Sequence, residues 1–296
     1  MGYSHKGLTY LNPILQVVRK IGVALHIVSP NRLRVLIYHD IPSEEEGAFR
    51  KQMHSLKKHW NIITPSEFEQ MITGGSQVNG DNLLITFDDG FSSNRIVAEN
   101  VLNPLGIKAI FFVISDFVKI KDRAESHKFI ADHIIPGSKV LDIPKSWGNM
   151  QLKDLSALIK QGHTIGWHTK LHTRLSECSS KNELEDELIL SSENLSHQLG
   201  IEINHFAYTF GDLESFSEAA HLVAKRKFRF IYSGLRGNNI QNISPLAIRR
   251  DAAAYQLPNN EYRVFNNRLL DSFLGGFADF RYKLSKKILD SWCRES

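Results

Sequence analysis

The chain has 296 residues, of which 42% are hydrophobic, and this length suits one large domain or two modest ones. The 36 basic and 32 acidic residues leave a net charge of only +4, so nothing in the charge balance points to nucleic acid as a partner. The two cysteines, Cys178 and Cys293, are too few for a disulfide framework and form no CxxC metal motif.

The N-terminal segment, residues 1–30, is predicted to be helical and amphipathic. Residues 11–28 place Arg19, Lys20 and His26 among apolar positions, so this helix could lie on a membrane surface or, as we favour, pack on its own domain. Its apolar run is too short for a signal peptide or a membrane span. We therefore expect a cytoplasmic protein, or one at the inner face of the membrane.

Strands and helices are predicted to alternate about seven times along the rest of the chain. The first half predicts a buried strand at 34–38, helices at 47–60 and after Thr64 or Ser66, a strand at 83–87, a helix at 94–105, a strand at 107–114 and an irregular insertion at 116–150. The second half predicts helices at 151–162, 181–199 and 216–227, strands near 163–168, 203–210, 228–233 and 246–251, and a mostly helical end. This order favours an α/β fold with parallel strands, as an open sheet or a barrel.

Two adjacent carboxylates, Asp88 and Asp89, follow the strand at 83–87, and Gly90 allows a sharp turn after them. In α/β folds the functional groups gather at the carboxyl ends of the strands. Neighbouring strand residues point to opposite sides, so we expect the two carboxylates to meet different environments. One could then bind a metal while the other accepts a proton. An ordinary Asp-Gly turn would also explain the motif taken alone.

His168 and His172 are four residues apart, and either a helix or a strand-to-loop turn could bring them together. With one carboxylate they would supply two nitrogens and one oxygen, a set that binds zinc or a similar ion and leaves a position open. With 13 histidines in the chain, some will have this spacing by chance. The aspartate pair is what makes a metal site the better interpretation.

Five stretches of the sequence resemble the polysaccharide deacetylase family. They are YHDIP at 38–42, ITFDDG at 85–90, FFV at 111–113, HTIGWHTKLHTRLSE at 163–177 and FAYTFGD at 206–212. The resemblance covers roughly residues 33–252 and implies a distorted (β/α) barrel with about seven parallel strands. We expect this catalytic barrel at residues 31–255, with a C-terminal helical extension, residues 256–296, packed on it.

Carried over residue by residue, the resemblance implies that Asp89, His168 and His172 bind one divalent metal ion. Zinc is expected first, with cobalt, nickel or iron as alternatives. Asp88 would be the general base that acts on metal-activated water, and the backbone N–H of Phe210 would help to bind the oxyanion. Four residues are expected on the substrate side of the site: His39, Asp40, Thr169 and Tyr208.

The sequence departs from the family pattern in two places. The family commonly has an arginine and a proline in its third motif, where this chain has Ala207 and Thr209. The arginine orients the base, and we expect Arg249 or Arg250 to replace it, although a surface arginine pair fits as well. Many members also carry a histidine on a late strand as general acid, and no histidine follows His221. Asp88 could then move both protons, another residue could be the acid, or catalysis could be lost.

The resemblance implies a metal-dependent hydrolase that removes an N-acyl group, foremost N-acetyl, from an amino sugar of a bacterial surface polysaccharide or its precursor. The barrel also resembles deformylases of lipid-linked amino sugars, so the acyl group and the acceptor stay open, as does peripheral contact with a membrane. One alternative is a catalytically degenerate glycan-binding or scaffold protein. The other, a 2-His-1-carboxylate iron oxygenase, is disfavoured because those sites usually lie on double-stranded β-helices.

Overall fold

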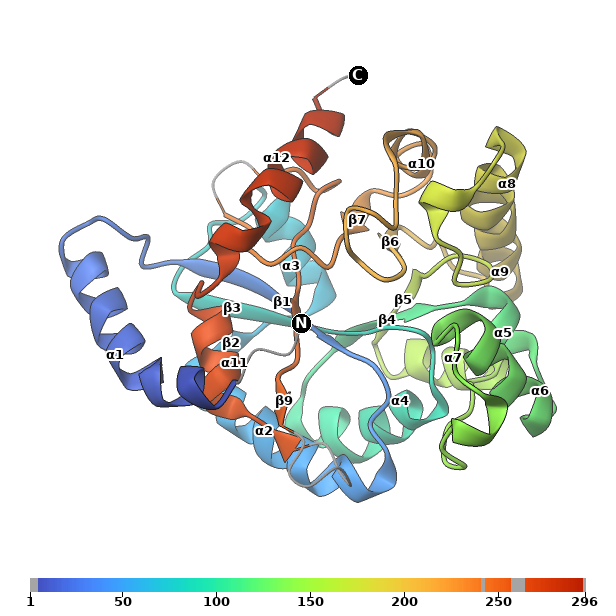
Figure 1. Ribbon diagram of the computed structural model, residues 1–296, viewed down its shortest axis with the longest axis horizontal. Coiled ribbons are helices and arrows are strands. Elements are labelled where there is room, and N and C mark those ends of the chain that lie inside the picture. The colour runs from blue at the N-terminus through green and yellow to red at the C-terminus, as the bar shows by residue number, and fades with distance from the viewer. Residues whose placement is uncertain (1–4, 241–242, 257–263, 295–296) are drawn as a thin grey trace.

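One parallel sheet organises the chain (Figure 1). The computed structural model describes residues 5–240, 243–256 and 264–294. The strands of this sheet are β1 (Arg32–Tyr38), β2 (Asn61–Ile62), β3 (Asp81–Phe87), β4 (Ala109–Val113), β5 (Thr164–Trp167), β6 (His205–Ala207), β7 (Phe230–Tyr232) and β8 (Asp251–Ala252). Their order is β7-β6-β5-β4-β3-β1-β8, with the short β2 also paired to β3, and every pair is parallel.

The segment that ends in β8 joins the two edges of this sheet. Ile248 forms a parallel bridge with Tyr232 of β7, and four residues later Ala252 pairs with Ile37 of β1. The first and last strands are therefore neighbours although they are far apart in the sequence. The predicted distorted barrel of about seven parallel strands is confirmed.

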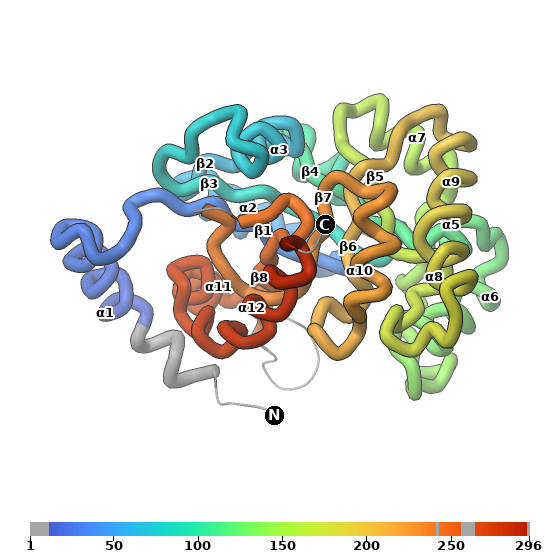
Figure 2. The backbone as a smooth tube through the Cα atoms, turned by 90° about the horizontal axis from the view of Figure 1, so that it is seen from above, coloured from blue at the N-terminus to red at the C-terminus, as the bar shows by residue number. Residues whose placement is uncertain are grey.

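Helices cover the outside of the sheet (Figures 1 and 2). Their bounds are α1 (His5–Ala24), α2 (Glu46–His59), α3 (Pro65–Ile72), α4 (Ser92–Val97), α5 (Ser115–Lys119), α6 (Arg123–Phe129), α7 (Leu152–Lys160), α8 (Lys181–Glu185), α9 (Ser191–Leu199), α10 (Glu218–Ala224), α11 (Asn267–Leu274) and α12 (Lys283–Trp292). Thr64 caps α3 in a capping box with Glu67, which identifies Thr64 rather than Ser66 as the cap. The long helix predicted at 181–199 is divided into α8 and α9 by a π-helical turn at 186–190.

Side-chain alternation along the strands separates two apolar layers. On β1, Leu33 and Val35 belong to the cluster inside the barrel, whereas Leu36 and Tyr38 belong to the larger cluster under the helices. Both sets are buried, which explains why the strands are nearly continuous apolar runs in the sequence. The inner layer leaves little room, because a Cβ on Gly166 of β5 would collide with the ring of Phe112.

The C-terminal part differs from its prediction. Two short strands, β9 (Tyr255–Gln256) and β10 (Val264–Phe265), pair antiparallel where helix was expected. Residues 1–4, 257–263 and 295–296 of the predicted terminal segments lie outside the described residues. None of the helices in the described part of the chain is long and apolar enough to cross a membrane.

Candidate active site

The residues singled out from the motifs meet at the carboxyl ends of the strands. Asp88 and Asp89 follow β3, His168 follows β5, and Arg250 comes directly before β8. These residues and His172 line a cavity of about 400 Å³. The architecture thus brings together groups from three segments of the chain at the edge where α/β barrels place their active sites.

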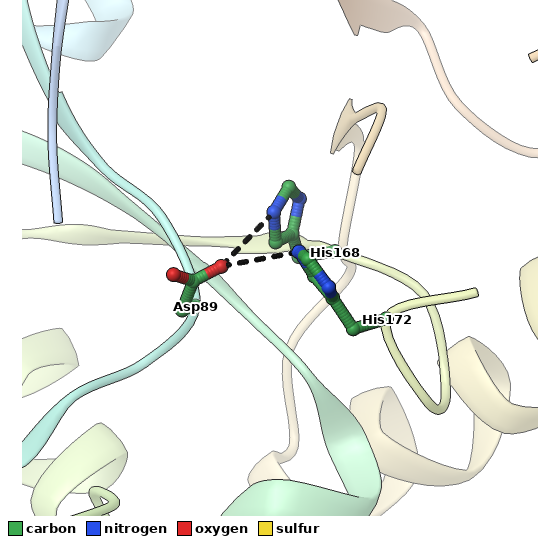
Figure 3. A group of neighbouring side chains, drawn as sticks. All are labelled: Asp89, His168 and His172. Carbon is green, nitrogen blue, oxygen red and sulfur yellow. Dashed lines mark ion pairs between the residues drawn. The ribbon is translucent and has the colours of Figure 1, made fainter. Parts of the chain in front are cut away.

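Asp89 and the two histidines form a compact group (Figure 3). The Oδ1 atom of Asp89 lies 3.4 Å from Nε2 of His168 and 3.4 Å from Nε2 of His172. Each histidine places its Nδ1 atom 2.8 Å from a backbone carbonyl oxygen, that of Ala207 for His168 and that of His133 for His172. A proton on Nδ1 donates to that carbonyl, so the Nε2 lone pairs are directed toward the carboxylate.

This group fits a divalent cation. Asp89 Oδ1 is buried and accepts no hydrogen bond within the described structure, a costly situation for a carboxylate oxygen. The ligand atoms of Asp89, His168 and His172 lie within 4.8 Å of one another. In a tetrahedral zinc site with bonds of about 2.1 Å, neighbouring ligand atoms are roughly 3.4 Å apart. The separations of Asp89 Oδ1 from both histidine nitrogens match that spacing.

The protonation states also suit metal binding. Burial by itself would raise the pKa of Asp89, but the nearby His168, His39 and His172 lower it overall. Burial lowers the pKa of His172 to about 4, so its ring is neutral at neutral pH. For His168, burial acts in the same direction, but the carboxylates of Asp88 and Asp89 outweigh it and raise the pKa. An ionised carboxylate and neutral imidazoles are the forms that bind a metal, and a cation replaces the proton that His168 would otherwise attract.

The backbone around the cavity is unusual. Asp89, Thr169, His172 and Phe210 have φ angles between 60° and 74°, in the left-handed region. Among the described non-glycine residues, only two others share this conformation. Each such residue costs of order 1 kcal/mol or more, and strain of this kind collects at functional sites.

The left-handed conformation also corrects the expectation that the two aspartates point to opposite sides. β3 ends at Phe87, and with a φ of 74° Asp89 no longer follows the strand. Asp88 and Asp89 consequently line the same cavity, although their partners differ. Gly90, with a φ of 87°, completes the turn as expected.

Asp88 is held by Arg250. The two terminal nitrogens of the guanidinium donate to the two carboxylate oxygens at 2.7 and 2.9 Å, and its Nε donates to the carbonyl of Ser233 at 3.0 Å. Arg249 instead donates to Asp290 of α12 and does not line the cavity. Of the two candidates only Arg250 reaches the site, because consecutive residues of an extended segment point to opposite sides.

Of the four residues expected on the substrate side of the site, His39, Asp40 and Tyr208 border the cavity and Thr169 does not. His39 and Asp40, at the end of β1, line the cavity, and Asp40 accepts a hydrogen bond from Ser93 at 2.6 Å. Thr169 is buried and does not line the cavity. Its carbonyl instead accepts a hydrogen bond from the N–H of Ser115, which ties its loop to the start of α5.

Three residues of the FAYTFGD stretch, Tyr208, Phe210 and Gly211, also border the cavity. The hydroxyl of Tyr208 lies 3.0 Å from Nδ1 of His221, and its ring stacks on Phe216 in the core, so the phenol is directed away from a substrate. The Phe210 ring lies 4.6 Å from that of His172 and carries the Arg174 guanidinium 4.0 Å from its centre. Phe210 therefore packs against a candidate metal ligand.

Part of the cavity wall was not predicted. Ile134, Ile135 and Trp147 come from the irregular insertion, and Tyr255 comes from β9. The insertion also supplies the His133 carbonyl that orients His172. No periodicity marks these positions, and the only signal was that an insertion follows a strand end at the active rim.

Comparisons with known proteins identify the family and the fold of the chain. The family model described as "Polysaccharide deacetylase" matches residues 75–227. The YxkH protein of Bacillus subtilis (strain 168), whose name places it with polysaccharide deacetylases, is 32% identical over 114 residues, which span 35% of this chain and 40% of the relative. Two solved structures share the fold: IcaB from Ammonifex degensii (TM-score 0.62, 20% identity, 83% of this chain and 97% of that chain) and the deacetylase PplD of Streptococcus pyogenes in complex with acetate (0.61, 19%, 83% and 99%).

Proposed function

The chain belongs to the polysaccharide deacetylase family, and from this premise we propose that it is a metal-dependent hydrolase of N-acylated amino sugars. The acyl group is foremost acetyl, and the sugar belongs to a bacterial surface polysaccharide or its precursor. The observation that carries the proposal is the group formed by Asp89, His168 and His172 next to the Asp88–Arg250 pair.

Asp89, His168 and His172 would hold the metal ion, zinc in the first place, with cobalt, nickel or iron as alternatives. A divalent cation bound there would polarise the acyl carbonyl and lower the pKa of a water molecule. The histidines are held for this role by the carbonyls of Ala207 and His133, which fix the orientation of both rings.

Asp88 is the general base in this proposal. Its Oδ2 atom lies 4.0 Å from Nε2 of His168, so the carboxylate is beside the ligands without being one of them. Arg250 engages both oxygens of Asp88 and so fixes the plane of the carboxylate. A water molecule between the base and the acyl carbon would lose its proton to Asp88 as it attacks.

His39 is the general acid in this proposal. The sequence offers no histidine on a late strand, but β1 and β8 are neighbours, so the end of β1 reaches the same part of the rim. His39 lines the cavity, and its charge contributes to the lowered pKa of Asp89. A protonated His39 would donate its proton to the leaving amine nitrogen, while the backbone N–H of Phe210 would support the oxyanion.

Acyl release from short N-acetylglucosamine oligosaccharides tests the proposal, with zinc-loaded protein and detection of free acetate. Asp88→Asn and His39→Gln are expected to lower kcat by at least about 100-fold, the usual range for loss of an acid or base. His54→Gln, a change of an exposed histidine outside the cavity, serves as the control. Glycan binding without acyl release by the wild type would favour the degenerate, glycan-binding alternative.

A further inference from the structure

Helix α1 leaves a row of large apolar side chains uncovered. We call this row the α1 ridge: Ile14, Val17, Val18 and Ile21 of the helix and Leu25 directly after it, whose exposed fractions run from 53% to 63%. Their spacing places them on one side of the helix. A contiguous exposed apolar surface of this kind marks a contact site far more often than single exposed hydrophobic residues do.

The opposite side of α1 already has its partners. Asn12 donates to the carbonyl of Arg268 and to the hydroxyl of Ser272 on α11. Arg19 donates to the carbonyl of Ser29 and to Asp81 at the start of β3. In both views α1 lies at the edge of the molecule (Figures 1 and 2). The helix is thus docked on its own domain, as favoured from the sequence, and it turns its ridge away from that domain.

Basic residues accompany the apolar surface. Beyond the end of α1, Ile27 and Val28 line a groove of about 940 Å³ together with Leu284 and two exposed lysines of α12, Lys283 and Lys287. We call this the basic groove. Apolar side chains and lysines therefore share one concave surface that starts where the ridge ends.

Acidic residues are missing from the N-terminal part of the sequence, and the two aspartates that line the basic groove, Asp279 and Asp290, are each paired with an arginine. The first 39 residues contain no aspartate or glutamate, whereas Lys20 of α1 is exposed next to the ridge. An amphipathic helix with an apolar face and neighbouring cations binds in the interfacial region of an anionic bilayer. A second copy of this chain would match the apolar ridge but would bring the same positive charge to it.

From these observations we propose that the α1 ridge and the basic groove dock the chain on the surface of an anionic lipid bilayer. The ridge side chains would enter the boundary between headgroups and acyl chains, and the lysines would lie at the headgroup phosphates. This inference does not depend on the proposed reaction.

Co-sedimentation of the full chain with vesicles tests the docking surface. We expect binding to vesicles that contain phosphatidylglycerol and much weaker binding to pure phosphatidylcholine. The triple variant Val17→Ser, Val18→Ser, Ile21→Ser is expected to lose at least tenfold in partitioning. Lys283→Gln and Lys287→Gln are expected to lose about fivefold each, since each cation near an anionic surface contributes that order of affinity.

Matched controls separate the ridge from general hydrophobicity and charge. The triple variant Leu141→Ser, Leu190→Ser, Leu222→Ser removes exposed apolar side chains elsewhere, and Lys128→Gln and Lys181→Gln remove exposed lysines elsewhere. These variants should bind like the wild type. Circular dichroism checks folding, and because the ridge is exposed, the spectra should be unchanged. Wild type that stays in solution with anionic vesicles, equal binding by both triple variants, or a ridge-dependent dimer without lipid binding would overturn the proposal.

Discussion

Two different environments surround three consecutive residues at the start of β8: Arg249, Arg250 and Asp251. Arg250 points into the barrel, where it donates to Asp88, while Arg249 and Asp251 point outward. On the outer side, Arg34 bonds to Asp251 at 3.1 Å and to Asp279 at 2.8 Å, and Arg249 bonds to Asp290. The outer ion pairs tie β1 and the β8 segment to the C-terminal helical part of the chain.

Two buried carboxylates show the difference most clearly. Burial raises the pKa of Asp251, and the nearby Arg34 only partly offsets this. The pKa of Asp89 is lowered despite equal burial, because histidines surround it. Oδ2 of Asp251 accepts from a guanidinium, which has only N–H donors and no lone pair to offer a metal, whereas Asp89 faces imidazole nitrogens that have lone pairs to share with a cation. The kind of partner, more than the depth of burial, therefore distinguishes a candidate metal ligand from a structural ion pair.

The largest effect on kcat is expected when Arg250 is replaced, and its neighbour Arg249 serves as the comparison. Arg250→Met should lower kcat by at least about 100-fold, because Asp88 loses the group that orients it. Arg249→Met should leave kcat within about threefold, because its partner, Asp290, lies outside the cavity. Steady-state kinetics of acetate release measures both, and metal content should be unchanged in each. Equal losses of kcat in the two variants would contradict the view that only the arginine on the inner side of the barrel acts on the reaction.

A second test addresses the outer side alone. Arg34→Met leaves Asp251 buried without its cation and should cost roughly 3–5 kcal/mol of unfolding free energy. The Arg34→Met, Asp251→Leu double variant should regain much of this loss, because it removes the unpaired charge as well. Denaturant unfolding measures both, and kcat of the folded fraction should not change. A kcat that falls with Arg34→Met would show that the outer ion pairs act on the reaction.

The smallest effect concerns a buried histidine outside the site. Nδ1 of His163 accepts from the N–H of Ala109, and its Nε2 lies 3.1 Å from Asn103 Oδ1, so both nitrogens have partners within the chain. Burial, with a contribution from Lys108, lowers the pKa of His163 to about 4. The unfolded chain binds this proton near pH 6.5, so the contribution to stability is complete above that pH and is lost as the pH falls toward 4.

The expected size of this loss is about 2 kcal/mol. The free energy of unfolding of wild type should therefore approach that of His163→Gln as the pH is lowered from 7 to 4.5. His54→Gln, which changes an exposed histidine, should run parallel to wild type. A difference in unfolding free energy between wild type and His163→Gln that stays constant from pH 7 to 4.5 would contradict the lowered pKa of His163.

Local patterns of the sequence predicted most of the fold and part of the site. Buried strands were recognisable as apolar runs because both of their faces are covered. The proximity of Asp89, His168 and His172 was predictable because these residues follow strand ends and belong to two short motifs. Asp89, His168 and His172 are in fact brought together by left-handed turns and loops, which periodicity does not encode.

The features that the sequence did not predict depend on how the barrel closes and on the register of its last strand. No histidine follows His221 in the sequence, but closure of the barrel places the end of β1, with His39, beside β8. Choosing between Arg249 and Arg250 required the register of the last strand, which a short, polar stretch does not reveal. The antiparallel β9 and β10 lie in a segment whose composition is equally typical of helix ends and loops.

Metal content of the purified protein tests the central claim most directly, because it requires no knowledge of the substrate. We expect about one divalent ion per chain in wild type and its loss in Asp89→Ala and in His168→Ala. Asp279→Asn, which changes a carboxylate of the outer ion pairs, should retain the ion. Wild type that binds no ion, even after reloading with zinc, cobalt, nickel or iron, would contradict the metal site and with it the proposed hydrolysis.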